Sequence, residues 1–321
     1  MKVKKELILL SVVIVGLSLY LIFRNQDNTH YKLPKLAHIS GKQISKIEIL
    51  KQETSIVLNK KDNSWHIGPD EYPANSDKIE KMLDVIEGLS LTALVSESEN
   101  YNRYDLNDEK KITIKAWEEG AVKRTFDIGK AASSFRHTFV KLGNDDRVYH
   151  ARGNFINDFG ETVEELRDKT VLAFNQDEIR QVRITKEKTE TQFTRTDIPI
   201  DVKTTEEPDT ATPPPSQVQT IWKTADDKKG DNANIERLLN SLSNLNCHEY
   251  INDSKKEDFS NPICTIELKG TKEYRLSIFP KMDKEASGYP AISSENNYPF
   301  SLRESQVDNL MKEPDELVKG M

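Results

Sequence analysis

The sequence predicts an α+β protein with an N-terminal transmembrane helix followed by two tandem repeats of antiparallel strands, each with a central and a terminal helix. Three observations support this prediction: an uncharged apolar run at the N-terminus, short segments rich in β-branched residues between polar turns, and one strand and helix pattern that occurs in both halves of the chain. The predicted divisions are a cytoplasmic tip and anchor at 1–23, a spacer at 24–43, a first repeat at 44–175 and a second repeat at 176–321.

Outside the N-terminal run, the composition is typical of a soluble globular protein. The 321 residues are enough for two ordinary domains, and 36% of them are hydrophobic while 31% are charged. The formal net charge is −7, so the chain lacks the basic surface that nucleic acid or an anionic lipid surface would require. We therefore expect no nucleic-acid partner.

Residues 7–23 form an unbroken uncharged run. As a helix with a rise of 1.5 Å per residue, the run would be about 25 Å long, which is enough to cross a thin bilayer core. Lys2, Lys4 and Lys5 precede it, and only Arg24 follows it closely. By the positive-inside rule, we expect the N-terminus in the cytoplasm, the run in the lipid of the cytoplasmic (inner) membrane, and the bulk of the chain in the periplasm or otherwise outside the cytoplasm.

A cleaved signal peptide is the alternative to this anchor. The run ends in bulky residues at 20–23, and no small-x-small cleavage site follows it. These features favour a signal anchor that stays attached to the chain. The polar spacer at 24–43 would then lift the first repeat off the membrane.

The first repeat is predicted to be a meander of short strands interrupted by one helix. Its expected strands lie at 44–49, 55–58, 64–67, 111–117, 122–128, 137–142 and 147–150. Asn75 or Ser76 can cap the central helix, and a helical stretch at 154–166 closes the repeat. The central helix is predicted from apolar residues at offsets of 0, 3, 4, 7 and 10, which are Ile79, Met82, Leu83, Ile86 and Leu89.

The second half repeats these features. Ile179, Val182 and Ile184 have the spacing of Ile44, Ile47 and Ile49, and Trp222 ends a strand as Trp65 does. The second helix has the same apolar offsets, at Ile235, Leu238, Leu239, Leu242 and Leu245. The two halves align at an offset of 156 in the helices and near 151 beyond them, where Arg124 pairs with Arg275 and Tyr149 with Phe300. Because the recurring residues are those that pack, we interpret the two tryptophans and the ten helix positions as structural core rather than as an active site.

Residues 197–216 have no counterpart in the first repeat. They contain five prolines with many threonines and acidic residues, and they show no apolar periodicity. We predict an extended or disordered loop, inserted between strands of the second repeat. A polyproline II partner motif at 213–215 is the alternative interpretation.

The two cysteines, Cys247 and Cys264, allow two interpretations. In an oxidising compartment, they can form a disulfide that closes a short loop. The corresponding residues of the first repeat are Leu91 and Ile112, which suggests buried thiols that act as small apolar side chains.

No segment carries a recognisable catalytic or metal-binding motif. The six histidines are scattered singly, without the spacing of a metal site, and His137 and His150 are the best candidates to face each other, across the turn at Gly143. The acidic doublets at 70–71, 145–146 and 226–227 fall in predicted turns, where aspartate is favoured. We therefore expect no cofactor, no metal and no enzymatic activity.

The chain resembles the bacterial proteins that carry domain of unknown function 4340. The resemblance rests on the N-terminal anchor, the strand and helix after Trp65, the element Tyr104-Asp105-Leu106, and residues 166–172, which read LRDKTVL. Members of the family typically have a Tyr-Gly-Leu element where this chain has Tyr104-Asp105-Leu106. The resemblance implies a membrane-anchored envelope protein built from repeats, of a kind often encoded beside ABC-type transport components similar to those of gliding-motility systems.

The function expected from these observations is that of a non-enzymatic scaffold or accessory binding subunit, associated with another envelope or transporter protein. Two similar lobes provide a broad surface without any catalytic group. The alternative is an envelope protein that binds a glycan or a peptide at a site between the two lobes.

Overall fold

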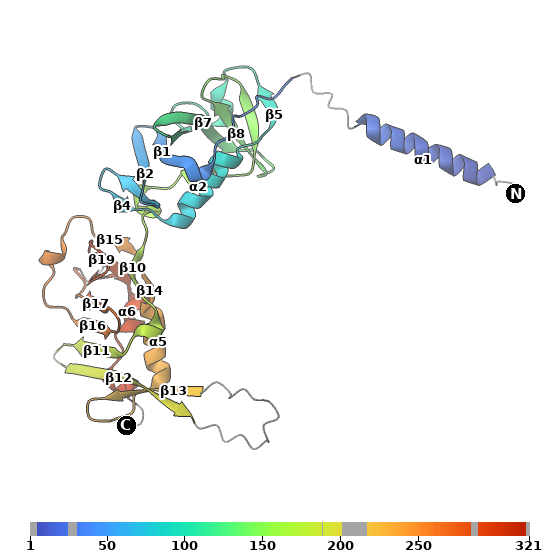
Figure 1. Cartoon of the computed structure of the whole chain (residues 1–321). Helices are drawn as coiled ribbons and strands as arrows, with labels where there is room; N and C mark the ends of the chain where they lie inside the picture. Colours follow the sequence, from blue (N-terminus) through green and yellow to red (C-terminus); the bar gives the residue numbers. More distant parts are fainter. Residues whose placement is uncertain (1–4, 25–30, 188, 201–216, 284–287, 319–321) are drawn as a thin grey trace. The chain divides into compact units, whose positions relative to one another are not determined.

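A computed structural model describes residues 5–24, 31–187, 189–200, 217–283 and 288–318 (Figure 1). The N-terminal helix α1 (Lys5–Arg24) covers the predicted run. Among the described residues, the structure contains no helix that combines the length and apolarity needed to cross a membrane. The rest of the chain folds mostly into antiparallel sheets with a few helices, as the predicted α+β class requires.

The chain divides into two compact units, one ending at Leu166 and the other starting at Arg167. The predicted boundary after residue 175 lies later than this division. Strand β10 (Thr170–Ala173) pairs with β14 (Asn244–Asn246), so these residues belong to the second unit.

The first unit is a nine-stranded antiparallel sheet in the order β4-β3-β2-β1-β6-β7-β8-β9-β5. Its elements are η1 (Gly41–Gln43), β1 (Ile44–Lys51), β2 (Thr54–Lys61), β3 (Ser64–Gly68), β4 (Tyr72–Pro73), α2 (Ser76–Gly88), β5 (Leu91–Ser96), η2 (Tyr101–Tyr104), β6 (Ile112–Glu118), β7 (Ala121–Ala131), β8 (His137–Leu142), β9 (Val148–Arg152), α3 (Ile156–Phe159) and α4 (Val163–Leu166). The expected terminal helix at 154–166 is therefore two short helices, α3 and α4, with Gly160 at the end of the first. Strand β5 was not predicted.

The second unit has an eight-stranded sheet in the order β13-β12-β11-β16-β17-β18-β19-β15. Besides β10 and β14, its elements are η3 (Gln176–Glu178), β11 (Gln181–Lys186), β12 (Thr189–Ile200), β13 (Gln217–Thr224), α5 (Asn232–Leu242), β15 (Glu249–Tyr250), η4 (Lys256–Asp258), β16 (Cys264–Lys269), β17 (Glu273–Ile278), β18 (Gly288–Ser293), β19 (Phe300–Arg303), α6 (Glu304–Leu310) and η5 (Pro314–Leu317). Of the predicted insertion at 197–216, residues 197–200 continue β12 and pair with β13, and the remainder lies outside the described residues.

Both units pack their helices against one face of the sheet. In the first unit the buried residues of α2 join Ile47 and Phe126 in one core, and in the second those of α5 join Val182 and Trp222. Eleven of the twelve predicted core residues are buried: Trp65, Ile79, Met82, Ile86, Leu89, Trp222, Ile235, Leu238, Leu239, Leu242 and Leu245. The twelfth, Leu83, is half-buried against the same core. Leu89 follows the end of α2 and Leu245 lies in β14, so the apolar pattern continues beyond both helices.

The spacing of the first isoleucines follows from a β-bulge. Ile44, Ile47 and Ile49 are buried although the first two are three residues apart, because the pairing of β1 with β6 shifts by one residue between Ile44 and Lys46. A second bulge, between Ala116 and Trp117, interrupts the β6–β7 ladder, whereas the β16–β17 ladder is regular. Arg124 pairs with the buried Ala116, whereas Arg275 pairs with Glu267 and is exposed, so the expected equivalence of Arg124 and Arg275 is wrong.

The spacer predicted at 24–43 is in part a component of the first unit. Ile39 is 2% exposed, and Leu33 and Leu36 pack against the core of the unit. Arg124 is buried and donates to the carbonyl oxygens of Ala37 and Ile86, which links this segment to the end of α2. Burial lowers the pKa of the Arg124 guanidinium. Residues 25–30 lie outside the described part of the chain.

Candidate interaction surfaces

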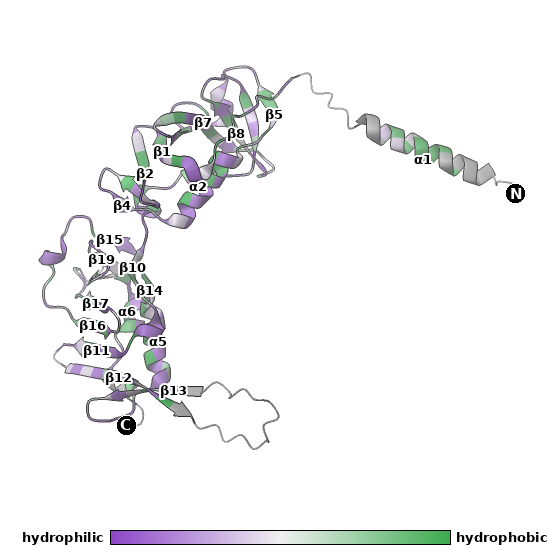
Figure 2. Cartoon of the chain, in the orientation of Figure 1, coloured by the Kyte–Doolittle hydropathy of each residue, from purple (hydrophilic) through white to green (hydrophobic). Residues whose placement is uncertain are grey.

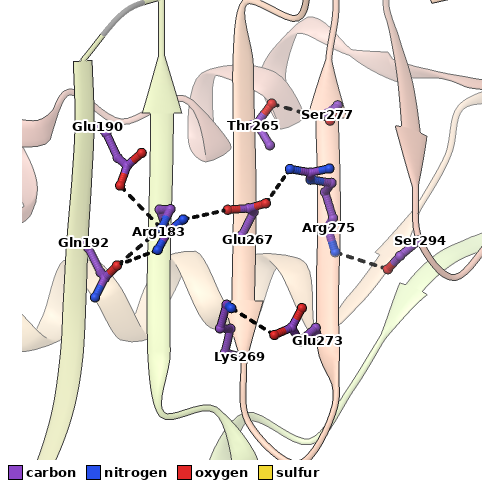
Figure 3. Close-up of polar contacts among 10 residues, drawn as sticks. All are labelled: Arg183, Glu190, Gln192, Thr265, Glu267, Lys269, Glu273, Arg275, Ser277 and Ser294. Carbon is purple, nitrogen blue, oxygen red and sulfur yellow. Dashed lines mark hydrogen bonds and ion pairs between the residues drawn. The ribbon is translucent and has the colours of Figure 1, made fainter.

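The sheet of the second unit has a charged face opposite its helices. In β11, Val182 and Ile184 are buried in the core, whereas Arg183 between them projects from the other face (Figure 3). Arg183 forms ion pairs with Glu190 at 3.4 Å and Glu267 at 3.6 Å. Its Nη2 also donates to Gln192 Oε1 at 2.9 Å, so one guanidinium spans three strands.

Further pairs extend this face across β16 and β17. Arg275 donates to Glu267 at 2.5 Å, Lys269 pairs with Glu273 at 2.9 Å, and the hydroxyls of Thr265 and Ser277 are 3.4 Å apart (Figure 3). The hydrogen bond from Lys269 lowers the pKa of the Glu273 carboxyl. We call this surface the polar face, defined as Arg183, Glu190, Gln192, Thr265, Glu267, Lys269, Glu273, Arg275 and Ser277.

The polar face is neutral overall, because it has three cations and three carboxylates. Exposed ion pairs of this kind stabilise a fold by at most about 1 kcal/mol each. A fixed pattern of opposite charges does discriminate between partners, since a mismatched charge on the partner is costly. The polar face is therefore better suited to recognising a partner than to stabilising the fold.

The corresponding face of the first unit is also polar, but it is partly covered. Glu48 and Lys115 pair across β1 and β6 at 3.2 Å. Asp127 accepts from Thr113 at 2.6 Å and lies 3.6 Å from Lys141, and it is only 6% exposed. A buried carboxylate with two such partners is a structural ion pair rather than a free acid or base.

The cover over this face includes Tyr104-Asp105-Leu106, one of the elements that carry the family resemblance. Leu106 is 2% exposed, and a Cβ at Gly129 would lie 2.2 Å from the carbonyl oxygen of Tyr104. Asp105 has φ of 56°, in the left-handed region that glycine adopts without strain and aspartate tolerates. The glycine found here in the family thus corresponds to a backbone requirement, which Asp105 meets with its short side chain.

The structure brings His137 and His150 together. Their rings stack with centroids 5.4 Å apart and planes at 26°, and Phe139 and Tyr104 continue the row of rings. Burial, with the adjacent His137, lowers the pKa of His150. Both histidines are half-buried, and they lie on neighbouring strands. The described residues contain no group of three or more potential metal ligands.

The acidic doublets lie in turns. Glu71 and Asp227 have positive φ, and Asp227 pairs with Lys223 at 2.7 Å. Asp145 accepts from the Arg147 side chain at 2.7 Å and from the Tyr149 hydroxyl at 2.7 Å. These bonds, above all those from Arg147, hold the pKa of Asp145 well below its usual range. Such a carboxylate is a poor proton acceptor.

Both cysteines are buried in the second unit, Cys247 at 7% and Cys264 at 0% exposed. No disulfide joins them among the described residues. Burial raises the pKa of the Cys264 thiol to about 11. Cys264 therefore packs as a small apolar side chain rather than acting as a nucleophile.

The segment at 166–172, which contributes to the family resemblance, begins with two buried residues. Leu166 is fully buried in the first unit, and Arg167 is 2% exposed in the second. The Arg167 guanidinium lies 3.7 Å from the ring centroid of Tyr250 and donates to Asn252 Oδ1 at 2.7 Å. The Tyr250 hydroxyl in turn donates to the carbonyl oxygen of Asp168 at 2.6 Å. These contacts are structural and assign the segment to the folding of the second unit.

Two antiparallel sheets, each with helices packed against one face, place the chain in the α+β class. Within that class, the chain belongs to the family described as Domain of unknown function (DUF4340), whose model matches residues 65–262, well over half of the chain. No curated protein and no solved structure matches the chain.

Proposed function

We propose that this chain is a single-pass, membrane-anchored extracytoplasmic protein that acts as a non-enzymatic scaffold or accessory binding subunit for another envelope protein. The observation that carries the proposal is the exposed apolar surface of α1. Its described large apolar side chains, including Leu10, Val12 and Tyr20, are between 48% and 63% exposed. Figure 2 colours much of this helix as hydrophobic. Soluble proteins rarely leave such a continuous apolar surface in water, and lipid tails would cover it.

The binding role is supported by the open sheet faces. Each unit buries one face of its sheet under helices and leaves side chains in fixed ion pairs on the other. A flat surface of this kind suits a protein partner, because its charges are held in place before the partner arrives. We assign the partner to an ABC-type transport system similar to those of gliding motility, in agreement with the family resemblance.

The orientation is tested by reporters fused after Met321. A reporter that is active only outside the cytoplasm is expected to be active, because the lysines at the N-terminus favour retention of that end inside. A reporter that is active only inside the cytoplasm would contradict the orientation.

The binding role is tested by a photoactivatable phenylalanine placed at Thr265, within the polar face. The matched control is the same amino acid at Ser241, an exposed residue on α5. We expect one membrane protein to be captured in living cells from position 265 and not from position 241. Repeated recovery of the chain alone, together with saturable thermal stabilisation by a glycan or a peptide, would overturn the scaffold function in favour of ligand binding.

A further inference from the structure

The turn between β7 and β8 exposes a phenylalanine in a strained conformation. Phe135 is 72% exposed and has φ of 56°, which bulky residues rarely adopt. Two short backbone hydrogen bonds fix the turn: Phe135 N–H donates to Ala132 O, and Ala132 N–H donates to His137 O, both at 2.8 Å. The fold therefore holds this aromatic ring in solvent. This arrangement is unfavourable because the ring is not buried and because the backbone is strained.

Three exposed cations lie in and beside this turn. Lys130, Arg136 and Arg152 are exposed, and no ion pair joins any of them to an acid within the described residues. Arg152 lies opposite His137 in the β8–β9 ladder, and Gly153 N–H donates to Arg136 O at 2.9 Å, so these residues are adjacent. Residues 128–140 and 147–157 contain no aspartate or glutamate, although the whole chain has a net charge of −7. We call Lys130, Phe135, Arg136 and Arg152 the aromatic tip.

The second unit also has an exposed apolar side chain between the corresponding strands. Met282, between β17 and β18, is 65% exposed. Its neighbour Lys281 pairs with Glu304 at 3.4 Å and lies over the ring of Tyr289. Both turns thus have an exposed apolar side chain.

We propose that the aromatic tip docks into an apolar pocket with an acidic rim on a protein partner, with Phe135 in the pocket and the three cations paired to the rim. This inference rests on the proposed function and identifies the surface and the chemistry of the partner. A buried aromatic ring surrounded by charge pairs is the usual arrangement of an interface hot spot.

The position of the aromatic tip favours a protein, rather than the lipid bilayer, as the partner that it contacts. Residues 34–37, which lead from α1 into the first unit, line a hollow with residues 122–125 and 142–145. That hollow is at one end of the β7–β8 hairpin and the aromatic tip is at the other, because Phe126 pairs with Leu142 while Ala131 pairs with Thr138. Six residue steps along β7, from Thr125 to Ala131, separate the two ends by about 20 Å. The tip therefore points away from the end at which a membrane anchor would enter.

The test uses the full-length chain in native membranes, with a photoactivatable phenylalanine at position 135. We expect capture of one protein whose crosslinked peptide contains aspartate or glutamate. Capture should fall at least tenfold when Arg136→Glu or Arg152→Glu is added, and a compensating Asp→Arg or Glu→Arg change at the crosslinked site of the partner should restore it. Capture of phospholipid, or capture that is insensitive to both charge reversals, would overturn the proposal.

Phe135→Gly provides the control for folding. Glycine adopts positive φ without strain, so this variant should unfold at the same temperature as the wild-type chain or a higher one. Co-purification of the captured partner should nevertheless fall at least tenfold, and Met282→Gly should leave it unchanged. If the photoactivatable residue captures a protein at Thr265 but none at position 135, the proposed scaffold function survives and this inference fails. If no protein is captured at position 265 or at position 135, both the proposed scaffold function and this inference are wrong.

Discussion

Asn75 donates its backbone N–H to the carbonyl oxygen of Leu166 at 2.8 Å, which ties the start of α2 to the last residue of the first unit. The second unit has the same bond, from Asp231 to Leu317, also at 2.8 Å. Both donors also cap their helix, because each side chain accepts from the backbone N–H three residues later. The duplication thus extends to individual hydrogen bonds.

The caps lead to the first prediction. Asn75→Ala should destabilise the first unit by about 1 kcal/mol, because the N–H of Lys78 loses its acceptor. Asn75→Ser retains an acceptor and should cost much less. Hydrogen exchange of the α2 amides in the full chain measures both effects. If Asn75→Ala and Asn75→Ser accelerate hydrogen exchange of the α2 amides equally, the result would contradict a capping role for Asn75.

The second prediction concerns the contact between Tyr104 and Gly129. Gly129→Ala should destabilise the first unit by about 2 kcal/mol or more, because the added Cβ meets backbone atoms of Tyr104 that have little room to move. Gly88→Ala is the matched control, since nothing lies within 4 Å of a Cβ there and alanine favours helix. Urea midpoints compare the two variants. A Gly129→Ala variant as stable as Gly88→Ala would refute the close contact.

Asp145 gives the stability a defined pH dependence. Its folded pKa is lowered by the Arg147 and Tyr149 bonds, while an unfolded aspartate titrates near 3.9. The ionised carboxylate therefore contributes stability above about pH 4, and the contribution is lost as the pH falls through the lowered folded pKa. The stability difference between wild type and Asp145→Asn should shrink between about pH 5 and pH 2.5 in urea titrations. A difference that does not change with pH would argue against the contribution of Asp145.

The cysteines predict a labelling pattern. Because both are buried and no disulfide joins them, a maleimide should label neither in the native chain and both after unfolding without reductant. Intact mass measures the number of labels. Labelling that requires a reductant would show that Cys247 and Cys264 are bonded after all.

Arg167 provides a comparison between buried and exposed arginines. Arg167→Lys should destabilise the second unit by about 2 kcal/mol, because lysine cannot both stack on Tyr250 and reproduce the planar bond to Asn252. Arg180→Lys, at an exposed pair with Asp197, should cost less than about 0.5 kcal/mol. Thermal unfolding of the two variants measures this difference. Similar losses of stability in both would show that burial does not determine how much Arg167 contributes to stability.

Much of the fold could be predicted because local periodicity marks what must be buried. Trp65 and Trp222, with the apolar positions of both helices, lie in the two cores, since a 3.6-residue period defines one helix face whatever surrounds it. Elements without a period of their own were missed. Every residue of strand β5 is half-buried, so the strand shows no alternation of buried and exposed residues. The described part of the spacer packs against the core through Leu33, Leu36 and Ile39, which are too few residues to show a pattern.

The candidate surfaces were much less predictable. Arg124 and Arg275 look equivalent in the aligned halves, yet one is buried and the other is on the polar face. Arg124 pairs with the buried Ala116, whereas Tyr274 pairs with the buried Leu268. The alignment is therefore one residue out in this strand, and a slip of one residue changes the face that a side chain occupies. Phe135 would ordinarily be assigned to a core. Its exposure is apparent only once the turn and its hydrogen bonds are in place.

Spacing along the chain indicated the repeated strand and helix pattern, the α+β class, the helix faces and the tryptophans of the two cores. The boundary at Leu166, the burial of Arg124, the stacking of His137 on His150 and the exposure of Phe135 became apparent only in the folded structure. Each of these depends on strand register and on which segments cover a sheet face. Such contacts join residues far apart in the sequence, and no local pattern encodes them.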